Sequence, residues 1–229
     1  MWMENGIPDL IQVRGFFILR DKQMAKKLVM IRHGVLDRKY HGRFMGKTDV
    51  GLSAAGQKQA AALALPVGSL RESHFIVSPL RRTQETARLA LAASGQTFDI
   101  DADLREIDFG LWEEKTFAEI STTDPAGVEQ WSNFDRDFVF PGGEALQSFI
   151  ERVRTAARRI VRDPAPTVTV ITHGGIIRFL ICHYLGLDMR NYLLFDVQPA
   201  SLSIMTLYDG QGILNSLNDL CHLEDRDRG

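Results

Sequence analysis

The chain has 229 residues, of which 45% are hydrophobic and 24% charged, and its formal net charge at pH 7 is −2. This length suits one large α/β domain, and the near balance of charges argues against nucleic acid or an anionic membrane as a partner. No stretch is long and apolar enough to span a bilayer, the first residues lack the pattern of a secretory signal, and the two cysteines match no zinc or redox spacing. We therefore expect a cytoplasmic protein, with its oligomeric state left open.

The first clear element is a buried strand at residues 27–31, a short apolar run that ends at the polar turn Arg32-His33-Gly34. Residues 35–52 predict an irregular loop. A helix capped by Ser53 follows, and we expect it to end at Pro66. Residues 75–77 predict a second buried strand, after which Ser78-Pro79 begins a helix that runs to about residue 93.

The second half of the chain continues the alternation of strands and helices. Residues 97–105 predict a weaker strand, and residues 106–142, which contain Gly, Trp and Pro, predict a lid-like insertion with short helical pieces. A long amphipathic helix is expected over residues 143–161. The strongest late strand is at 167–171, followed by a helix through residue 185 and further strands at 193–197, 201–207 and 212–217.

This order predicts a three-layer α/β/α fold with a mostly parallel central sheet. We expect residues 1–26 to be an N-terminal extension and residues 27–229 to form a single domain.

Polar residues suited to a phosphate group follow three of the predicted strands. Arg32 and His33 follow the first, the helix with Arg82 follows the second, and His173 follows the third. In an open α/β sheet, ligands bind beyond the carboxyl ends of the strands. Each residue alone has an ordinary explanation as a solvated or capping group, but their joint occurrence at strand ends predicts one site.

Phosphoryl transfer without a metal needs a small set of groups, and this chain supplies them. Guanidinium groups match phosphate oxygens, a neutral imidazole can act as the nucleophile, and a carboxylic acid can protonate the leaving oxygen. We assign Arg32, Arg82, His33, His173 and Glu106 to these roles.

The motifs around these residues resemble those of the histidine phosphatase (phosphoglycerate mutase-like) superfamily. Residues 28–34 read Leu-Val-Met-Ile-Arg-His-Gly, residues 46–60 resemble the family's G-x-x-D-x-x-L-(S/T)-x-x-G-x-x-Q-A, and residues 78–87 resemble S-x-L-x-R-A-x-x-T-A. Residues 104–113 resemble the segment that bears the acid, and residues 140–144 and 170–175 complete the set. The resemblance covers about residues 27–223.

The resemblance implies a phosphoglycerate mutase-like fold and a mechanism without metal or other cofactor. His33 would attack phosphorus and become a phosphohistidine. Arg32, Arg82 and His173, with Gly174 beside it, would bind the phosphoryl oxygens. Glu106 would protonate the leaving oxygen and then activate water.

The chain departs from the family pattern after the first motif. Val35-Leu36 stand where the family usually has Glu-Thr, and Arg38-Lys39 stand where it often has Trp-Asn. We expect Lys39, Arg38 or Arg43 to supply the missing phosphate donors, the alternative being a solvated basic loop.

The short insertion favours a phosphatase over a phosphoglycerate mutase, and the loop at residues 42–49 looks like that of α-ribazole phosphatases. We therefore expect hydrolysis of a small-molecule phosphate ester, with α-ribazole 5'-phosphate as one candidate. Two other hypotheses stay open: a non-catalytic phospholigand-binding protein, and a metallohydrolase with His33, His173 and Glu106 as ligands. Aromatic side chains of the insertion could stack on a base or form lid core: Trp112, Phe117, Trp131, Phe134 and Phe138.

Overall fold

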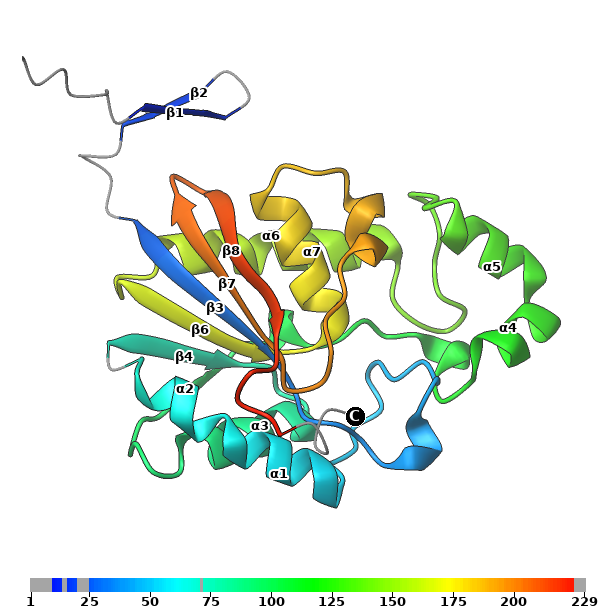
Figure 1. Cartoon of the computed structure of the whole chain (residues 1–229). Coiled ribbons are helices and arrows are strands. Elements are labelled where there is room, and N and C mark those ends of the chain that lie inside the picture. The colour runs from blue at the N-terminus through cyan, green and yellow to red at the C-terminus, as the bar shows by residue number, and fades with distance from the viewer. Residues whose placement is uncertain (1–9, 14–15, 20–24, 71, 225–229) are drawn as a thin grey trace, which may run out of the picture.

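A central sheet of six strands organises the computed structural model, which describes residues 10–13, 16–19, 25–70 and 72–224 (Figure 1). The strands are β3 (Lys26–Arg32), β4 (Ser73–Val77), β5 (Asp99–Ile100), β6 (Thr167–Thr172), β7 (Leu202–Tyr208) and β8 (Gln211–Asp219), in the order β5-β4-β6-β3-β7-β8. β5, β4, β6 and β3 run parallel, whereas β7 is antiparallel to β3 and β8 antiparallel to β7. The mostly parallel sheet is confirmed.

Helices cover both faces of this sheet (Figure 1). One face carries α1 (Ala54–Ala62), α2 (Ala64–Gly68) and α3 (Arg81–Leu91), and the other carries α6 (Leu146–Arg162) and α7 (Gly174–Tyr184). Side chains of β3 alternate between the two layers: Leu28 and Met30 join the cluster under α6 and α7, and Val29 and Ile31 join the cluster under α3. This period of two is the strand geometry of a sheet buried on both faces.

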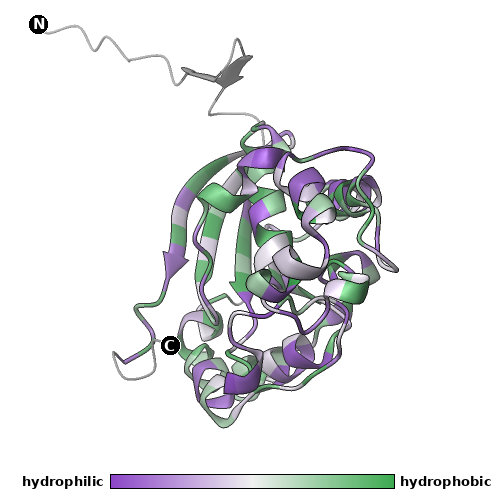
Figure 2. Ribbon diagram, turned by 90° about the vertical axis from the view of Figure 1, so that its right-hand side faces the viewer, coloured by the Kyte–Doolittle hydropathy of each residue, from purple (hydrophilic) through white to green (hydrophobic). Residues whose placement is uncertain are grey.

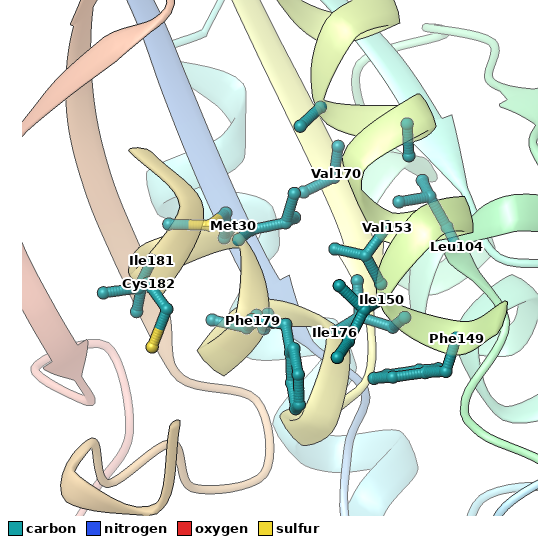
Figure 3. Packing of buried hydrophobic residues seen from close by; sticks show 14 of the residues in the cluster. Met30, Leu104, Phe149, Ile150, Val153, Val170, Ile176, Phe179, Ile181 and Cys182 are labelled. Atoms are coloured by element: carbon teal, nitrogen blue, oxygen red, sulfur yellow. The ribbon is translucent and has the colours of Figure 1, made fainter. Parts of the chain in front are cut away.

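The larger core lies between the sheet and the pair α6–α7. Figure 3 shows Met30 and Val170 of the sheet facing Val153 of α6 and Ile176 of α7. In Figure 2 the strands are mostly in the colour of hydrophobic residues, whereas hydrophobic and hydrophilic residues alternate along the helices. None of the described helices combines the length and apolar character that a bilayer crossing requires.

The insertion predicted at residues 106–142 contains η3 (Gly110–Trp112), α4 (Phe117–Thr123) and α5 (Pro125–Ser132). Thr116 and Glu119 form a reciprocal capping box that starts α4. Asp124 caps α5, and Pro125 occupies its first turn, where an amide N–H is not needed. Two other short helices, η1 (Arg38–Tyr40) and η4 (Met189–Leu194), border the same end of the sheet.

Two predicted strands are wrong in extent. Residues 97–105 contain only the two-residue β5, because the Asp101 side chain accepts from Asp103 N–H and starts the turn η2 (Ala102–Leu104). Residues 193–197 form no strand: η4 runs to Leu194, and β7 already pairs with the β3 edge. Leu193 and Leu194 of this run lie on the surface, 61% and 78% exposed, whereas Val197 is buried in the core.

Helix boundaries also differ in two places. Pro66 does not end a helix but lies within the first turn of α2, where its missing N–H has no intrahelical partner to lose. The helix after Pro79 begins at Arg81, where the Asp49 carboxylate accepts from the backbone N–H at a distance of 2.6 Å.

Within residues 1–26 the structure describes β1 (Leu10–Val13) and β2 (Phe16–Leu19), which pair antiparallel. The remaining residues of the segment before position 25 lie outside the described residues. Its assignment as an extension, and that of residues 27–229 as a single domain, stay predictions.

Candidate active site

The parallel register of the sheet brings His33 and His173 together. Arg32 at the end of β3 pairs with Thr172 at the end of β6, so the next residue of each strand emerges at the same edge. His33 N–H donates to the Thr172 carbonyl at 3.0 Å, and the two imidazole rings lie with centroids 5.3 Å apart. His33 and His173 are therefore neighbours, although they lie 140 positions apart in the chain.

Two glycines of the first two motifs make this turn compact. A Cβ on Gly34 would lie 2.4 Å from the Gly56 carbonyl oxygen, and a Cβ on Gly56 would lie 2.1 Å from the Val35 carbonyl oxygen. Gln59 of α1 accepts from Val35 N–H at 2.8 Å. The glycine and glutamine of residues 46–60 thus hold the nucleophile loop against α1.

His33 is arranged as a nucleophile. Its Nδ1 lies 2.8 Å from the Gly34 carbonyl oxygen, and because a carbonyl only accepts, Nδ1 carries the ring proton and Nε2 holds the lone pair. Burial, together with the charges of Arg82 and Arg32, lowers the pKa of His33 well below its usual value. The ring is therefore neutral at pH 7.

His173 lies beneath the site and is tied to its neighbours through both ring nitrogens. Arg82 Nε donates to His173 Nδ1 at 3.2 Å, so Nε2 carries the proton and donates to Ser78 Oγ at 2.7 Å. Burial and the Arg82 charge lower the pKa of His173 well below its usual value. The side chain is fully buried.

Arg82 is also fully buried, and much of its guanidinium binds protein groups. Besides His173, Nη1 donates to the Thr48 carbonyl at 2.9 Å and Nη2 to the Gly46 carbonyl at 2.7 Å. Burial lowers its pKa. Direct contact of Arg82 and His173 with a phosphoryl oxygen stays a prediction, because neither lines the cavity described below.

Arg32 has one buried N–H donor, at Nε, that no described residue accepts. Its Nη1 donates to the Val197 carbonyl at 2.6 Å, while its Nε is buried without a hydrogen-bond partner among the described residues. Burial and the nearby charge of Arg178 lower the pKa of Arg32 to about 10, so the group stays cationic at neutral pH. An unpaired buried donor is costly, and an anion at this position would remove that cost.

Glu106 lies opposite, on the segment between η2 and η3, and is 8% exposed. Its Oε2 accepts from Gly175 N–H in the first turn of α7 at 3.0 Å, and its Oε1 accepts from Ile107 N–H at 3.2 Å. Arg152 of α6 holds this segment by donating to the carbonyls of Asp103, Arg105 and Glu106. The neighbouring Arg105 pairs with Glu144 at 3.6 Å, and no ion pair between Arg105 and Glu106 is found among the described residues.

A cavity of about 620 Å³ opens over these groups, and Arg32, His33, Glu106 and Gly174 are among its lining residues. Arg43 also lines it, but its Nε donates to the Lys39 carbonyl at 2.9 Å and its Nη1 to Glu119 at 3.1 Å. Lys39 does not line it and lies exposed, with its ammonium 4.8 Å from the centre of the Tyr40 ring. Substrate binding by Lys39 and Arg43 stays a prediction.

Two residues that the sequence reasoning missed complete the site. Arg178 of α7 lines the cavity and is fixed by the bond from its Nε to the Phe195 carbonyl at 2.8 Å. It lies one helical turn after Gly174, a spacing that could have revealed it. For Arg152 the sequence gives no sign of its support of Glu106, because the carbonyls that it binds in that segment lie 46 to 49 positions away.

The aromatic residues of the insertion divide between core and cavity. Trp112 and Phe138 are buried in the core, and Phe117 is 52% exposed, so none of these three lines the cavity. Phe134 packs against Phe179 from behind, with ring centroids 6.3 Å apart. Trp131 lines the cavity.

The described residues contain no group of three or more His, Cys, Asp or Glu side chains that could hold a metal ion. The imidazoles of the site instead lie beside guanidinium groups. These positive charges would repel a metal cation from His33, His173 and Glu106, the ligand set of the metallohydrolase hypothesis.

Comparisons with known proteins agree with the motifs. The model of a family described as "Histidine phosphatase superfamily (branch 1)" matches residues 28–220. The chain is 31% identical to "Phosphoserine phosphatase 1" of Hydrogenobacter thermophilus over 86% of this chain and 94% of that protein. It is 26% identical to "Probable phosphoglycerate mutase GpmB" of Salmonella paratyphi C over 86% of this chain and 95% of that protein.

The fold also matches that of a solved structure. The α-ribazole phosphatase from Shigella flexneri superposes with a TM-score of 0.76 at 27% identity, covering 84% of this chain and 96% of that chain. The predicted three-layer fold is confirmed by this match.

Proposed function

The chain belongs to the histidine phosphatase superfamily and is a phosphatase. From this membership we propose that it hydrolyses a small-molecule phosphomonoester through a phosphohistidine on His33, without a metal ion. The observation that carries this proposal is the state of His33. Its ring is neutral, its Nδ1 proton is held by the Gly34 carbonyl, and its Nε2 keeps the lone pair. Arg32, whose Nε has no hydrogen-bond partner among the described residues, lines the same cavity.

In the first half of the reaction, His33 Nε2 attacks phosphorus while the bond from phosphorus to the ester oxygen breaks. Arg32 stabilises the charge on the phosphoryl oxygens. Glu106, at the edge of the cavity, donates its proton to the leaving oxygen, which departs as an alcohol.

In the second half, water attacks the phosphohistidine. Glu106, now a carboxylate, takes a proton from that water, and the bond between His33 and phosphorus breaks. The products are the alcohol and inorganic phosphate, and the enzyme returns to its starting state. Hydrogen bonds from Gly175 and Ile107 hold the Glu106 carboxylate in place for both steps.

We place this activity in the cytoplasm, with a small molecule and neither nucleic acid nor membrane as the partner. α-Ribazole 5'-phosphate is the candidate substrate. It is supported by the similarity to the Shigella flexneri α-ribazole phosphatase and by the aromatic lining of the cavity.

Phosphoglycerate mutase activity is the second candidate, favoured by the similarity to the Salmonella protein of that name. A mutase returns the phosphoryl group to a substrate oxygen and must keep water away from the phosphohistidine. The open cavity over His33 favours hydrolysis instead. A non-catalytic binding protein is the third candidate, and the preserved neutral His33 argues against it.

The test is phosphate release in excess EDTA from α-ribazole 5'-phosphate, 3-phosphoglycerate and 4-nitrophenyl phosphate, with the H33A variant as control. We expect release that depends on His33. Conversion of 3-phosphoglycerate to its 2-isomer without phosphate release would establish a mutase, and activity only with added metal would exclude the phosphohistidine mechanism. No turnover by a folded protein would leave a binding function.

A further inference from the structure

The cavity is far larger than a phosphate group, and two kinds of side chain dominate its lining. Its volume of about 620 Å³ lies within the range of sites for whole small molecules. The groups suited to a phosphoryl group are Arg32, His33, Glu106 and Arg178. The other kind is aromatic: Tyr40, Phe44, Phe109, Trp131, Phe149, Phe179 and Tyr192.

These rings form two supported groups on different elements. Phe44 packs edge-to-face on Phe109 and Trp131, with centroids 5.0 Å and 5.6 Å apart. Phe179 of α7 contacts Tyr192 of η4 at 4.7 Å and Phe149 of α6 at 4.9 Å (Figure 3 labels Phe149 and Phe179). Rings held by other rings present fixed flat surfaces, which suits stacking on a planar ligand.

Trp131 of the insertion belongs to the first group, and Tyr192 of η4 belongs to the second. The insertion and η4 are in contact, because the rings of Phe134 and Tyr192 lie with centroids 6.2 Å apart. Burial raises the pKa of Tyr192 to about 12, and the ring is neutral at physiological pH. Both side chains are half-buried and line the cavity.

The cations that line the cavity balance a phosphomonoester and little more. Arg32 and Arg178 carry two positive charges, Glu106 carries the proton that the first step requires, and a phosphomonoester dianion therefore cancels the charge. Arg43 also lines the cavity, but it is paired with Glu119 and bound to the carbonyls of Lys39 and Glu114. A carboxylate on the alcohol half of the substrate would therefore have to compete with Glu119 for Arg43 in an otherwise aromatic region, which is unfavourable.

We propose that the substrate of this phosphatase is the phosphate ester of an uncharged alcohol with an aromatic or similarly flat apolar body, and that Trp131 and Tyr192 determine this specificity. The inference rests on the proposed function. The alcohol oxygen lies at Glu106 and His33, and the ring of the alcohol packs against the faces of Trp131 and Tyr192. The reaction is unchanged: the ester bond to phosphorus breaks and the neutral alcohol leaves.

The test compares alkyl phosphates with similar leaving groups and different bodies. Benzyl phosphate carries an uncharged ring, ethyl phosphate carries none, and O-phosphoserine and 3-phosphoglycerate carry a carboxylate. Since stacking on an aromatic side chain favours binding by about tenfold or more, we expect kcat/KM for benzyl phosphate to exceed that of the other three by at least about tenfold.

Variants then assign the preference to its residues. W131A and Y192A should lower kcat/KM for benzyl phosphate about tenfold, mainly through KM, and leave ethyl phosphate nearly unchanged. Y192F retains the ring and should keep the preference. F117A removes an aromatic ring of the same insertion that lies outside the cavity, and it should behave as the unmodified protein.

The outcomes separate the two proposals. No turnover of any ester in EDTA would overturn the proposed function. Turnover with phosphoserine or 3-phosphoglycerate equal to or better than benzyl phosphate would overturn the specificity and leave the function standing. Equal losses for ethyl and benzyl phosphate in W131A and Y192A, in proteins that retain their thermal midpoint, would overturn the specificity by showing that these side chains act only as structural supports.

Discussion

Gly175 sets the position of the catalytic acid, and the variant G175A tests that role. A Cβ at this position would lie 2.4 Å from Glu106 Oε1 and 3.1 Å from its carboxyl carbon. Contact at an ordinary distance would require the carboxylate to retreat by about 1 Å, and a displacement of that size in a reacting group costs about 100-fold in rate. The clash is with the end of a flexible side chain, so the fold should adapt.

The helix itself should tolerate the change. Gly175 lies in the first turn of α7, where alanine is favoured over glycine by up to about 1 kcal/mol. We therefore expect G175A to unfold at the same temperature as the unmodified protein or a few degrees higher. Loss of activity without loss of stability is the signature of a displaced acid.

The assay is kcat/KM, which reports only the steps through release of the alcohol. Benzyl phosphate has a poor leaving group that needs a proton, and we expect a loss of about 100-fold. 4-Nitrophenyl phosphate has a good leaving group and should lose only a few-fold. In the comparison variant G174A the new Cβ meets Arg32 at 3.5 Å, so any loss should fall equally on the two substrates. Equal losses in G175A would refute the reasoning.

Three further predictions concern buried and titrating groups. R152M should lower the free energy of unfolding by about 3–5 kcal/mol, because the buried Glu144 carboxylate loses its two-point partner and keeps only the longer contact with Arg105 at 3.6 Å, and because the three carbonyls that Arg152 binds lose their donor; urea denaturation measures this, and a change below about 1 kcal/mol would contradict it. Burial by itself would lower the pKa of His74, but its hydrogen bonds to Asp163 and Asp99 outweigh this effect, so the pKa is raised above its usual value. Because the folded pKa is raised, the stability that His74 contributes is present below about pH 6.5 and lost as the pH rises through the folded value, so H74Q should destabilise the protein at pH 6 and much less at pH 9. Titration of His33 by NMR should show the neutral ring persisting well below pH 6.5, and a midpoint near 6.5 would exclude the buried, neutral nucleophile.

The sequence predicts well which residues meet at the strand ends, for two reasons. Strands 27–31, 75–77 and 167–171 are apolar runs whose ends can be located within a residue, and parallel strands end at the same edge. His33 and His173 could therefore be placed together before the structure, and they lie with ring centroids 5.3 Å apart.

What the sequence does not predict depends on contacts between distant segments. The apolar run at residues 193–197 has the composition of a strand, but the β3 edge is already occupied by β7, so the chain forms η4 instead. The support of Glu106 by Arg152 comes from a helix more than 40 positions away. Nothing in the local sequence distinguishes Trp131 from Trp112. Only the tertiary packing places Trp131 in the cavity wall and Trp112 in the core.

The position of β3 in the sheet has a consequence for the protein during synthesis. β3 is paired on both sides, by β6 and by β7, yet about 135 residues separate its end from the start of β6. At the usual pace of translation, roughly 7–27 s pass before the first neighbour emerges. During this interval an apolar strand with two open edges is a template for association with other chains. The nascent chain should therefore depend on chaperones until β6 is made, and dilute refolding should give a higher yield than concentrated refolding.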